Sequence, residues 1–233
     1  MAAPGSLPLY MQISELLIRD IAAGRLIDGE RLRPERDMAA DLGIAVGTLR
    51  QALKDLSAKG MLSRVQGSGN YIRAKADPAS VYALLRIELA TGGGLPTARV
   101  LSVDRLPKDP RLPSFGSSPE GHRIRRLRFL SGVVAAVEEI WLDATFIPVI
   151  AVGDLSESLY FYYRQKLGLW IARAEDSIGM GPLPGWTPVE FPHPAGLPLP
   201  QITRISVDQE GRSIEASWTW YDPETVRYVA RLK

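Results

Sequence analysis

The 233-residue sequence predicts an α+β protein, in which a winged helix-turn-helix precedes a larger antiparallel sheet domain with helices. Helix-stop, helix-start and hairpin signals follow one another within residues 33–72 in the order that a winged helix-turn-helix requires. A series of alternating apolar runs after residue 123 is typical of mixed antiparallel strands. Residues 73–78 are polar and contain a proline, and we interpret them as a linker. We therefore expect domains at residues 1–76 and 77–233.

Two helices joined by a short turn open the N-terminal pattern. Residues 32–39 begin a short helix that Gly43 can end, and residues 44–48 connect it to a longer helix that Gly60 can end. Apolar residues at helical spacing predict the buried face of the longer helix. They are Leu49, Ala52, Leu53 and Leu56.

Another helix precedes these two, and a small hairpin follows them. The first helix, between Pro8 and Gly24, has an apolar stripe made of Leu9, Ile13, Leu16, Leu17 and Ile21. Residues 62–65 and 70–73 read as two short strands joined by residues 66–69. Two helices joined by a turn and followed by a hairpin place one helix in a DNA major groove, so the pattern predicts a transcription factor.

The second part of the chain reads mostly as strands. Residues 123–130 and 133–142 alternate around a probable turn at residues 131–132, and residues 202–207 and 213–221 form a similar pair. The pattern therefore predicts an antiparallel sheet.

Less regular segments accompany these strands. Residues 156–167 predict a helix with Ser156 as its N-cap and Gly168 as its stop. Residues 226–232 predict a last strand, and the proline-rich residues 182–200 predict no regular element.

Composition excludes several classes of protein. With no cysteine and two histidines, we expect neither disulfides nor a metal site, and no cofactor. No apolar run approaches the ~20 residues that cross a bilayer, and the N-terminus lacks a secretory profile, so we expect a cytoplasmic protein with no membrane contact. Residues 1–76 hold eleven lysines and arginines against eight acidic residues, which suits phosphate contact but also fits an ordinary solvated surface.

Three N-terminal segments occur in a specific order. They are Gly29-Glu30-Arg31-Leu32-Arg33-Pro34-Glu35-Arg36, then Thr48-Leu49-Arg50-Gln51-Ala52-Leu53, and then, after Gly60, Gly67-Ser68-Gly69-Asn70-Tyr71-Ile72. In this order they resemble the GntR family of bacterial transcription factors. The resemblance implies binding to double-stranded DNA and assigns Arg36 to the family position that holds DNA near the groove edge.

The first turns of the longer helix are expected to read base edges, while arginines and helix N-termini hold phosphates. Arg50 can reach guanine or a phosphate, although any single arginine can also be a solvated surface charge. GntR proteins often have Ser and Arg where this chain has Ala45 and Val46, so a base-reading arginine is missing and Val46 offers only apolar contact. The predicted DNA-binding residues are Arg36, Val46, Gly47, Thr48, Arg50, Gln66 and Gly67.

The C-terminal part carries a second, looser set of matching features. They are Arg126-Leu127-Arg128, Val137-Glu138 before Trp141-Leu142, Ser158-Leu159-Tyr160, and Gly211-Arg212-Ser213-Ile214-Glu215 followed by Tyr221. These features are similar to the UTRA domain of HutC-type regulators, which implies a chorismate-lyase-like fold that binds a small effector. Two departures are that residues 80–85 lack the Gly/Phe/Ser-type loop of phosphosugar binders, and that residues 182–200 replace a commonly helical region.

Charged residues interrupt apolar faces of the predicted strands. Arg126 and Arg128 share a strand face with apolar neighbours, and Glu138 does so on the next strand. The arginines can bind an anionic ligand, or they can form an internal salt bridge with Glu138, and both can hold when no ligand is bound. The predicted effector-binding residues are Arg126, Arg128, Glu138, Ser158, Tyr160, Glu215 and Tyr221.

These observations together predict a ligand-responsive repressor. We expect a homodimer that binds a palindromic operator and is released by a small polar anionic metabolite. No catalytic set is recognisable, so we expect no enzyme activity. Two alternatives are an effector-blind DNA-binding protein whose second domain only dimerises, and a lyase-like enzyme fused to a DNA-binding head.

Overall fold

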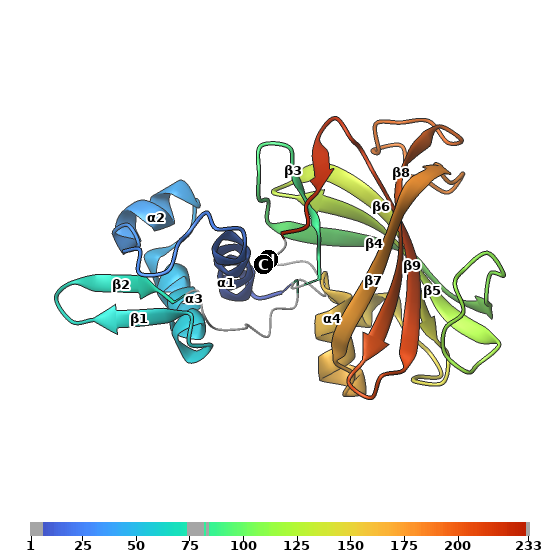
Figure 1. The fold of residues 1–233 in the computed structure, drawn as a ribbon, viewed down its shortest axis with the longest axis horizontal. Coiled ribbons are helices and arrows are strands. Elements are labelled where there is room, and N and C mark those ends of the chain that lie inside the picture. Colours follow the sequence, from blue (N-terminus) through green and yellow to red (C-terminus); the bar gives the residue numbers. More distant parts are fainter. Residues whose placement is uncertain (1–6, 74–81, 83, 232–233) are drawn as a thin grey trace. The chain divides into compact units, whose positions relative to one another are not determined.

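A computed structural model describes residues 7–73, 82 and 84–231 (Figure 1). Its contacts divide the chain into two compact units, residues 7–85 and residues 86–229. Apart from Arg73, the predicted linker at residues 73–78 lies outside the described residues, as do residues 80, 81 and 83 of the 80–85 segment. The division between residues 76 and 77 therefore stays a prediction.

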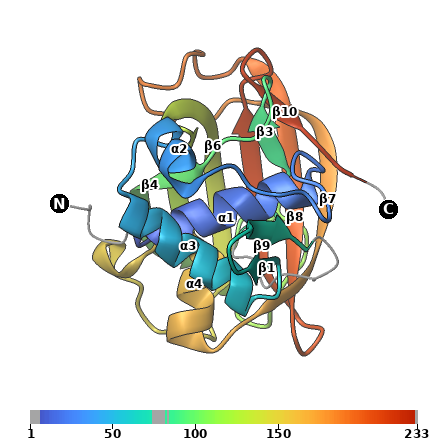
Figure 2. The same cartoon turned by 90° about the vertical axis from the view of Figure 1, so that its left-hand side faces the viewer.

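The N-terminal unit has the predicted winged helix-turn-helix order, and its helices face the viewer in Figure 2. Its helices and strands are α1 (Leu9–Ala22), α2 (Glu35–Asp41), α3 (Val46–Ala58), β1 (Leu62–Val65) and β2 (Gly69–Ile72). Pro34 precedes α2, where its fixed φ suits a helix start, and the chain turns out of α2 and α3 at Gly43 and Gly60. The strands β1 and β2 pair antiparallel.

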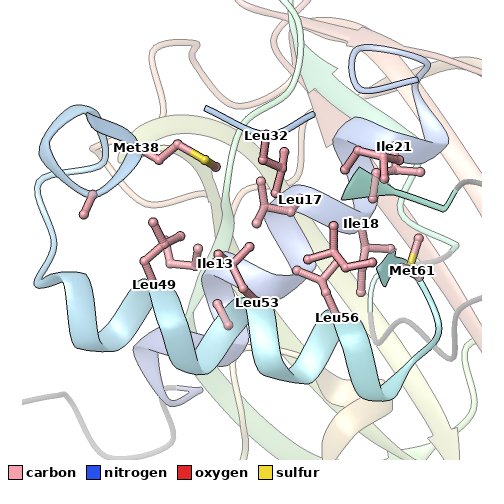
Figure 3. Packing of buried hydrophobic residues seen from close by; sticks show 14 residues of the cluster. Ile13, Leu17, Ile18, Ile21, Leu32, Met38, Leu49, Leu53, Leu56 and Met61 are labelled. Atoms are coloured by element: carbon pink, nitrogen blue, oxygen red, sulfur yellow. The ribbon is translucent and has the colours of Figure 1, made fainter. Parts of the chain in front are cut away.

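One hydrophobic core holds the three helices and the hairpin together (Figure 3). Leu49, Leu53 and Leu56 on α3 point toward α1, and the whole predicted face of α3 is buried. The predicted stripe of α1 is wrong at Leu9, which is exposed because it lies in the first turn, and Ile18 is a core residue instead. This packing fixes which face of α3 remains open to solvent.

Polar contacts also join α1 to α3. The Ser14 hydroxyl donates to Asp55 (2.5 Å), and the Lys59 ammonium contacts Glu15 (3.2 Å) and Asp55 (2.8 Å). Burial alone would lower the pKa of Lys59, but Asp55 and Glu15 outweigh it, so that this pKa lies above its ordinary value. These contacts add directional restraints to a packing that is otherwise apolar.

The C-terminal unit contains a six-stranded antiparallel sheet with the order β4-β5-β6-β9-β8-β7 (Figure 1). The strands are β4 (Pro96–Pro107), β5 (Glu120–Leu130), β6 (Val133–Asp143), β7 (Ile171–Pro182), β8 (Pro198–Asp208) and β9 (Ser213–Tyr221). Two short strands, β3 (Ile87–Leu89) and β10 (Val226–Tyr228), pair separately. The β5–β6 turn is tight because Ser131 and Gly132 both have positive φ, 49° and 79°, as the sequence predicts.

Different segments of the chain pack on the two faces of this sheet. Segments from residues 109–116 and 183–197 pack on the face that carries Val137 and Trp218. The helix α4 (Leu159–Tyr162) and the π-helical turn η2 (Tyr163–Leu167) send tyrosine hydroxyls to Glu215 on the other face. A short 3-10 turn, η1 (Val152–Asp154), precedes α4.

Several sequence expectations need correction here. The helix N-cap is Ser158, whose Oγ accepts from the Phe161 amide (3.3 Å), because α4 starts later than the predicted Ser156 cap. The last strand ends at Tyr228 rather than residue 232, and the ends of the 182–200 segment belong to strands. The strands β3, β4 and β7 were not predicted.

Candidate nucleic-acid interface and ligand site

The residues predicted to contact DNA base edges lie in the first turns of α3. Gly47 and Arg50 are exposed, and Thr48 is half-buried. Val46 is also half-buried and packs against the hydrophobic core, so only part of its side chain is open to a DNA base. Leu49 faces the core and holds this end of the helix in place.

A groove of about 1040 Å³ separates the starts of α2 and α3 from the β1–β2 hairpin. Its lining brings together Arg36, Arg50, Gln66 and Gly67. Five arginines line the groove, Arg31, Arg33, Arg36, Arg50 and Arg64, against two carboxylates, Glu35 and Asp37. A concave surface with this excess of positive charge suits a phosphate backbone.

The groove arginines differ in their partners. Arg50 Nε donates to Glu35 Oε2 (2.7 Å), and Arg33 contacts Asp41 (2.5 Å), with the Arg50 side chain 66% exposed. Arg36 is exposed and forms no ion pair within the described residues. Exposed pairs contribute little free energy, so these side chains can exchange carboxylates for phosphates.

The hairpin loop is shaped by a close approach of Arg31. A Cβ at Gly69 would lie 3.1 Å from Arg31 Nε, and Gly69 has a φ of 131°, which favours glycine. The Ser68 and Tyr71 hydroxyls are hydrogen-bonded (2.6 Å), while Gln66 is exposed at the tip.

Sequence reasoning missed Arg31, Arg33 and Arg64 as groove residues, although their charge was visible in the printed sequence.

The predicted salt-bridge alternative is present in the C-terminal unit. Arg126 on β5 lies directly opposite Glu138 on β6, and its Nη2 is 2.7 Å from Glu138 Oε2. Arg128 donates from Nε to Oε1 and from Nη2 to Oε2 of the same carboxylate, both at 3.1 Å. All three side chains are at least 94% buried.

The charges in this cluster set the pKa of Glu138. Burial would raise it, but the positive charges of Arg126 and Arg128 and their hydrogen bonds outweigh burial, so the pKa lies below its ordinary value of 4.5. Glu138 is therefore held ionised, and two buried cations share one anion.

Arg126 also connects the sheet to the start of α4. Its Nη1 donates to the Glu157 carbonyl (3.2 Å), next to the N-cap residue Ser158. The Ser158 side chain is buried at this point. Arg126 thus links the β5–β6 pair to the residue before the helix N-cap.

Glu215 is the centre of a second buried polar cluster. Its Oε2 accepts from the Tyr163 hydroxyl (2.6 Å), and its Oε1 accepts from the hydroxyls of Ser206 (2.8 Å) and Tyr160 (3.3 Å). Burial raises the pKa of Glu215, although these hydrogen bonds and nearby arginines act in the opposite direction. Glu215 therefore resists ionisation, unlike Glu138.

The predicted effector residues all lie at one face of the sheet. Strand pairing sets Glu138 beside Thr219, so Glu215 and Tyr221, an even number of residues away, share its face. Sequence reasoning missed Ser206, Tyr163 and an ion pair between Arg204 and Asp176 (2.6 Å). Alternation along the predicted strand at residues 202–207 would have found Arg204 and Ser206.

No group of three or more potential metal-ligating side chains occurs among the residues that the structure describes. None of the described helices is long and apolar enough to cross a membrane.

A winged helix-turn-helix with an arginine-lined groove, joined to a sheet domain with a buried charged cluster, defines a DNA-binding regulator with a sensory domain. Residues 9–72 match the family model of bacterial regulatory proteins, gntR family, and residues 91–227 match the UTRA domain model. The chain therefore belongs to the GntR family, and it is a DNA-binding transcription regulator of the UTRA-containing type.

Individual relatives agree with this assignment. The chain is 60% identical over 229 residues, 98% of each chain, to the HTH-type transcriptional regulator SmoD of Agrobacterium fabrum. It is 27% identical, over 75% of each chain, to the repressor MngR of Escherichia coli. Its fold is similar to that of the possible transcriptional regulator YydK from Bacillus subtilis, with a TM-score of 0.56, 22% identity and coverage of 97% of this chain and 100% of the other.

The opposite pKa shifts of the two buried carboxylates give a paired prediction. Glu138→Gln removes the carboxylate charge that pairs with both buried arginines and should lower the free energy of unfolding by about 3–5 kcal/mol at pH 7. Glu215→Gln should cost much less, because Glu215 is already poorly suited to ionisation. All five tryptophans lie in the C-terminal unit, so denaturant unfolding followed by tryptophan fluorescence reports on this unit.

The two variants should also differ in pH dependence. The folded pKa of Glu138 is lowered, so its stabilisation is present above pH 4.5 and is lost as the pH falls through the folded pKa. The folded pKa of Glu215 is raised, so the wild type should lose stability relative to Glu215→Gln as the pH rises through that pKa. Equal effects of both variants would contradict the assigned charges.

Proposed function

We propose that the chain is a repressor that binds a palindromic operator as a homodimer and leaves it when a small polar anion binds the sheet domain. The observation that carries this proposal is the charge of the Glu138 cluster. Two buried arginines share one ionised carboxylate, and the nearby Glu215 resists ionisation. An anionic ligand group that enters this cluster would accept charge-assisted hydrogen bonds from the arginines.

The contacts of Arg128 suggest where the ligand anion binds. Both hydrogen bonds from Arg128 to Glu138 are 3.1 Å, whereas Arg126 contacts the same carboxylate at 2.7 Å. The anionic group of the ligand pairs with Arg128 in place of Glu138. Glu138 remains paired with Arg126 and accepts hydrogen bonds from hydroxyls of the ligand. Because Arg126 also holds the Glu157 carbonyl, binding would reach the start of α4. Ser158, Tyr160 and Tyr221 complete the proposed site.

Relatives support the repressor role and the ligand class. One relative is named a mannosyl-D-glycerate transport/metabolism system repressor, and another, from Bacillus subtilis, is the repressor NagR. Glycerate carries a carboxylate and mannose carries hydroxyls, which is the combination that arginines and carboxylates on one face would recognise.

The strand β7 supports the proposed dimer. It is an edge strand of the sheet, and Ile178 and Met180 are 54% and 64% exposed on it. A long edge with exposed apolar side chains is suited to pairing with a second copy. Such a dimer would space two winged helices for two half-sites.

A second candidate is an effector-blind DNA-binding protein whose sheet domain only dimerises. The observation in its favour is that Glu138 already forms ion pairs with both arginines within the chain. Mass spectrometry of small molecules released from the purified protein separates the two, since only the first candidate binds a ligand.

DNA binding is tested by removing the groove arginines. Arg36→Ala and Arg50→Ala should each weaken operator binding by about 1–3 kcal/mol, and binding should fall steeply with salt. Fluorescence anisotropy with labelled operator measures this. The matched control is Arg25→Ala, which removes an arginine outside the groove lining. Wild-type affinity in both groove variants would exclude the proposed interface.

Ligand response is tested with Arg128→Ala. This variant leaves Glu138 paired with Arg126 one to one, so the sheet domain should stay folded. It should lose about 1.5–3 kcal/mol of ligand affinity and fail to release DNA, while DNA affinity itself changes little. The assay is DNA release by sugar acids, carboxylated metabolites and phosphorylated sugars, with circular dichroism as the folding control. If the ligands release DNA from Arg128→Ala as well as from the wild type, Arg128 does not bind the ligand anion.

The dimer is tested at the β7 edge. Met180→Lys places a charge on the exposed edge and should convert dimers to monomers in sedimentation velocity, because a buried unpaired lysine opposes association. Val189→Lys is the control, since Val189 is 98% exposed outside any strand. A dimer that survives Met180→Lys does not use this edge.

A further inference from the structure

The face of the sheet opposite the Glu138 cluster contains a second cavity. Its volume is about 590 Å³, within the range of about 300–1,000 Å³ that is usual for small-molecule sites. It lies in the C-terminal unit, and residues 182–186, at the start of the proline-rich segment, form part of its lining. The wall that distinguishes it consists of three indole rings and one amide, those of Trp186, Trp218, Trp220 and Gln201.

Strand alternation places these side chains away from the charged cluster. Trp218 and Trp220 alternate along β9 with Glu215 and Tyr221, so they lie on the opposite face. The Trp186 ring comes from the covering segment and meets Trp220 at a centroid distance of 6.3 Å and 79°. Trp218 and Trp220 are also 6.3 Å apart, at 53°. The three rings form an aromatic corner.

One polar atom of this corner lacks a partner. Trp220 Nε1 is buried and has no hydrogen-bond acceptor within the described residues, and Trp220 as a whole residue is 95% buried. An indole N–H can only donate, and buried donors are nearly always paired. The nearby Trp141 Nε1 does have an acceptor, Glu139, at 3.0 Å. Trp220 is therefore poised to donate to a group that enters the cavity.

The charges around the cavity are already compensated. Arg125 pairs with Glu139 (2.8 Å), and Arg111 pairs with Asp109 (2.6 Å). A third lining arginine, Arg123, pairs with Asp104 (2.9 Å). Unlike the Glu138 cluster, this cavity has no excess charge that an ionic ligand would neutralise. The Gln201 side chain forms no hydrogen bond within the described part of the chain.

We propose that this cavity is a second binding site, for a neutral saccharide. The indole rings contact the apolar face of a sugar ring, Trp220 Nε1 donates to a sugar oxygen, and the Gln201 amide bonds a hydroxyl. The Arg111 guanidinium now lies 5.5 Å from the Trp218 ring centre, and its side chain is 79% exposed, so a sugar ring can displace it. The site is separate from the proposed effector site and does not depend on it.

Saturation-transfer NMR of the full chain with methyl glucoside, methyl galactoside, methyl mannoside and maltose tests the proposal. At least one of these probes should bind with a dissociation constant of about 1 mM or tighter. Trp220→Phe keeps an aromatic ring but removes the N–H, and Gln201→Leu removes the amide. Each should weaken binding at least about tenfold, which corresponds to one lost hydrogen bond. The matched control is Trp170→Phe, since Trp170 contacts Arg164 outside the cavity.

Three results would overturn the proposal. The first is that none of the four probes binds the wild type. The second is that a probe binds equally to the wild type, Trp220→Phe and Gln201→Leu, which would place it elsewhere. The third is that Trp186→Ala abolishes dimerisation in sedimentation velocity and the probes do not bind, which would make the cavity part of an interface between copies. If Trp220→Phe fails to fold, Gln201→Leu decides the outcome.

Discussion

The ligand face of the sheet depends on the sharing of one carboxylate, that of Glu138, between two buried arginines. Arg126 and Arg128 come from β5, Glu138 comes from β6, and the other end of Arg126 holds the carbonyl before the N-cap of α4. A single carboxylate therefore influences three features of this domain. It helps to hold β5 against β6, it orients the arginine that contacts the start of α4, and it sets the charge of the proposed site. Desolvation makes each of these charges costly alone, so none of the three can be removed without affecting the others.

Exposure determines what the arginines of the two units can do. In the N-terminal groove the Arg50–Glu35 pair lies at the surface, where water screens it and exchange for a phosphate costs little. In the sheet domain the same residue type is buried, so its partner can be changed only if another anion arrives. The core of α1 and α3 makes the first arrangement possible, since it fixes which face of α3 stays open.

The sequence predicts the N-terminal unit well because its helices follow the 3.6-residue period, as Leu49 and Leu53 do. It also predicts the β5–β6 hairpin, because residues 131–132 give a clear turn signal between two long strand-like runs. It does not reveal β7, because an edge strand with exposed Ile178 and Met180 has no alternating pattern. The pairing of Glu138 was predictable as one of two alternatives. The polar partners of Glu215 come from two segments far apart in the sequence, and only Tyr160 among them was predicted, while Tyr163 and Ser206 were missed.

The alternation of charges along β5 and β6 has a consequence for folding. Arg125 faces Glu139 on one side of the sheet, and Arg126 faces Glu138 on the other. If the pairing of β5 with β6 shifted by one residue, both ion pairs would break together. Each charged side chain would then lie opposite an apolar side chain. A misaligned hairpin would therefore be penalised on both faces of the sheet at once.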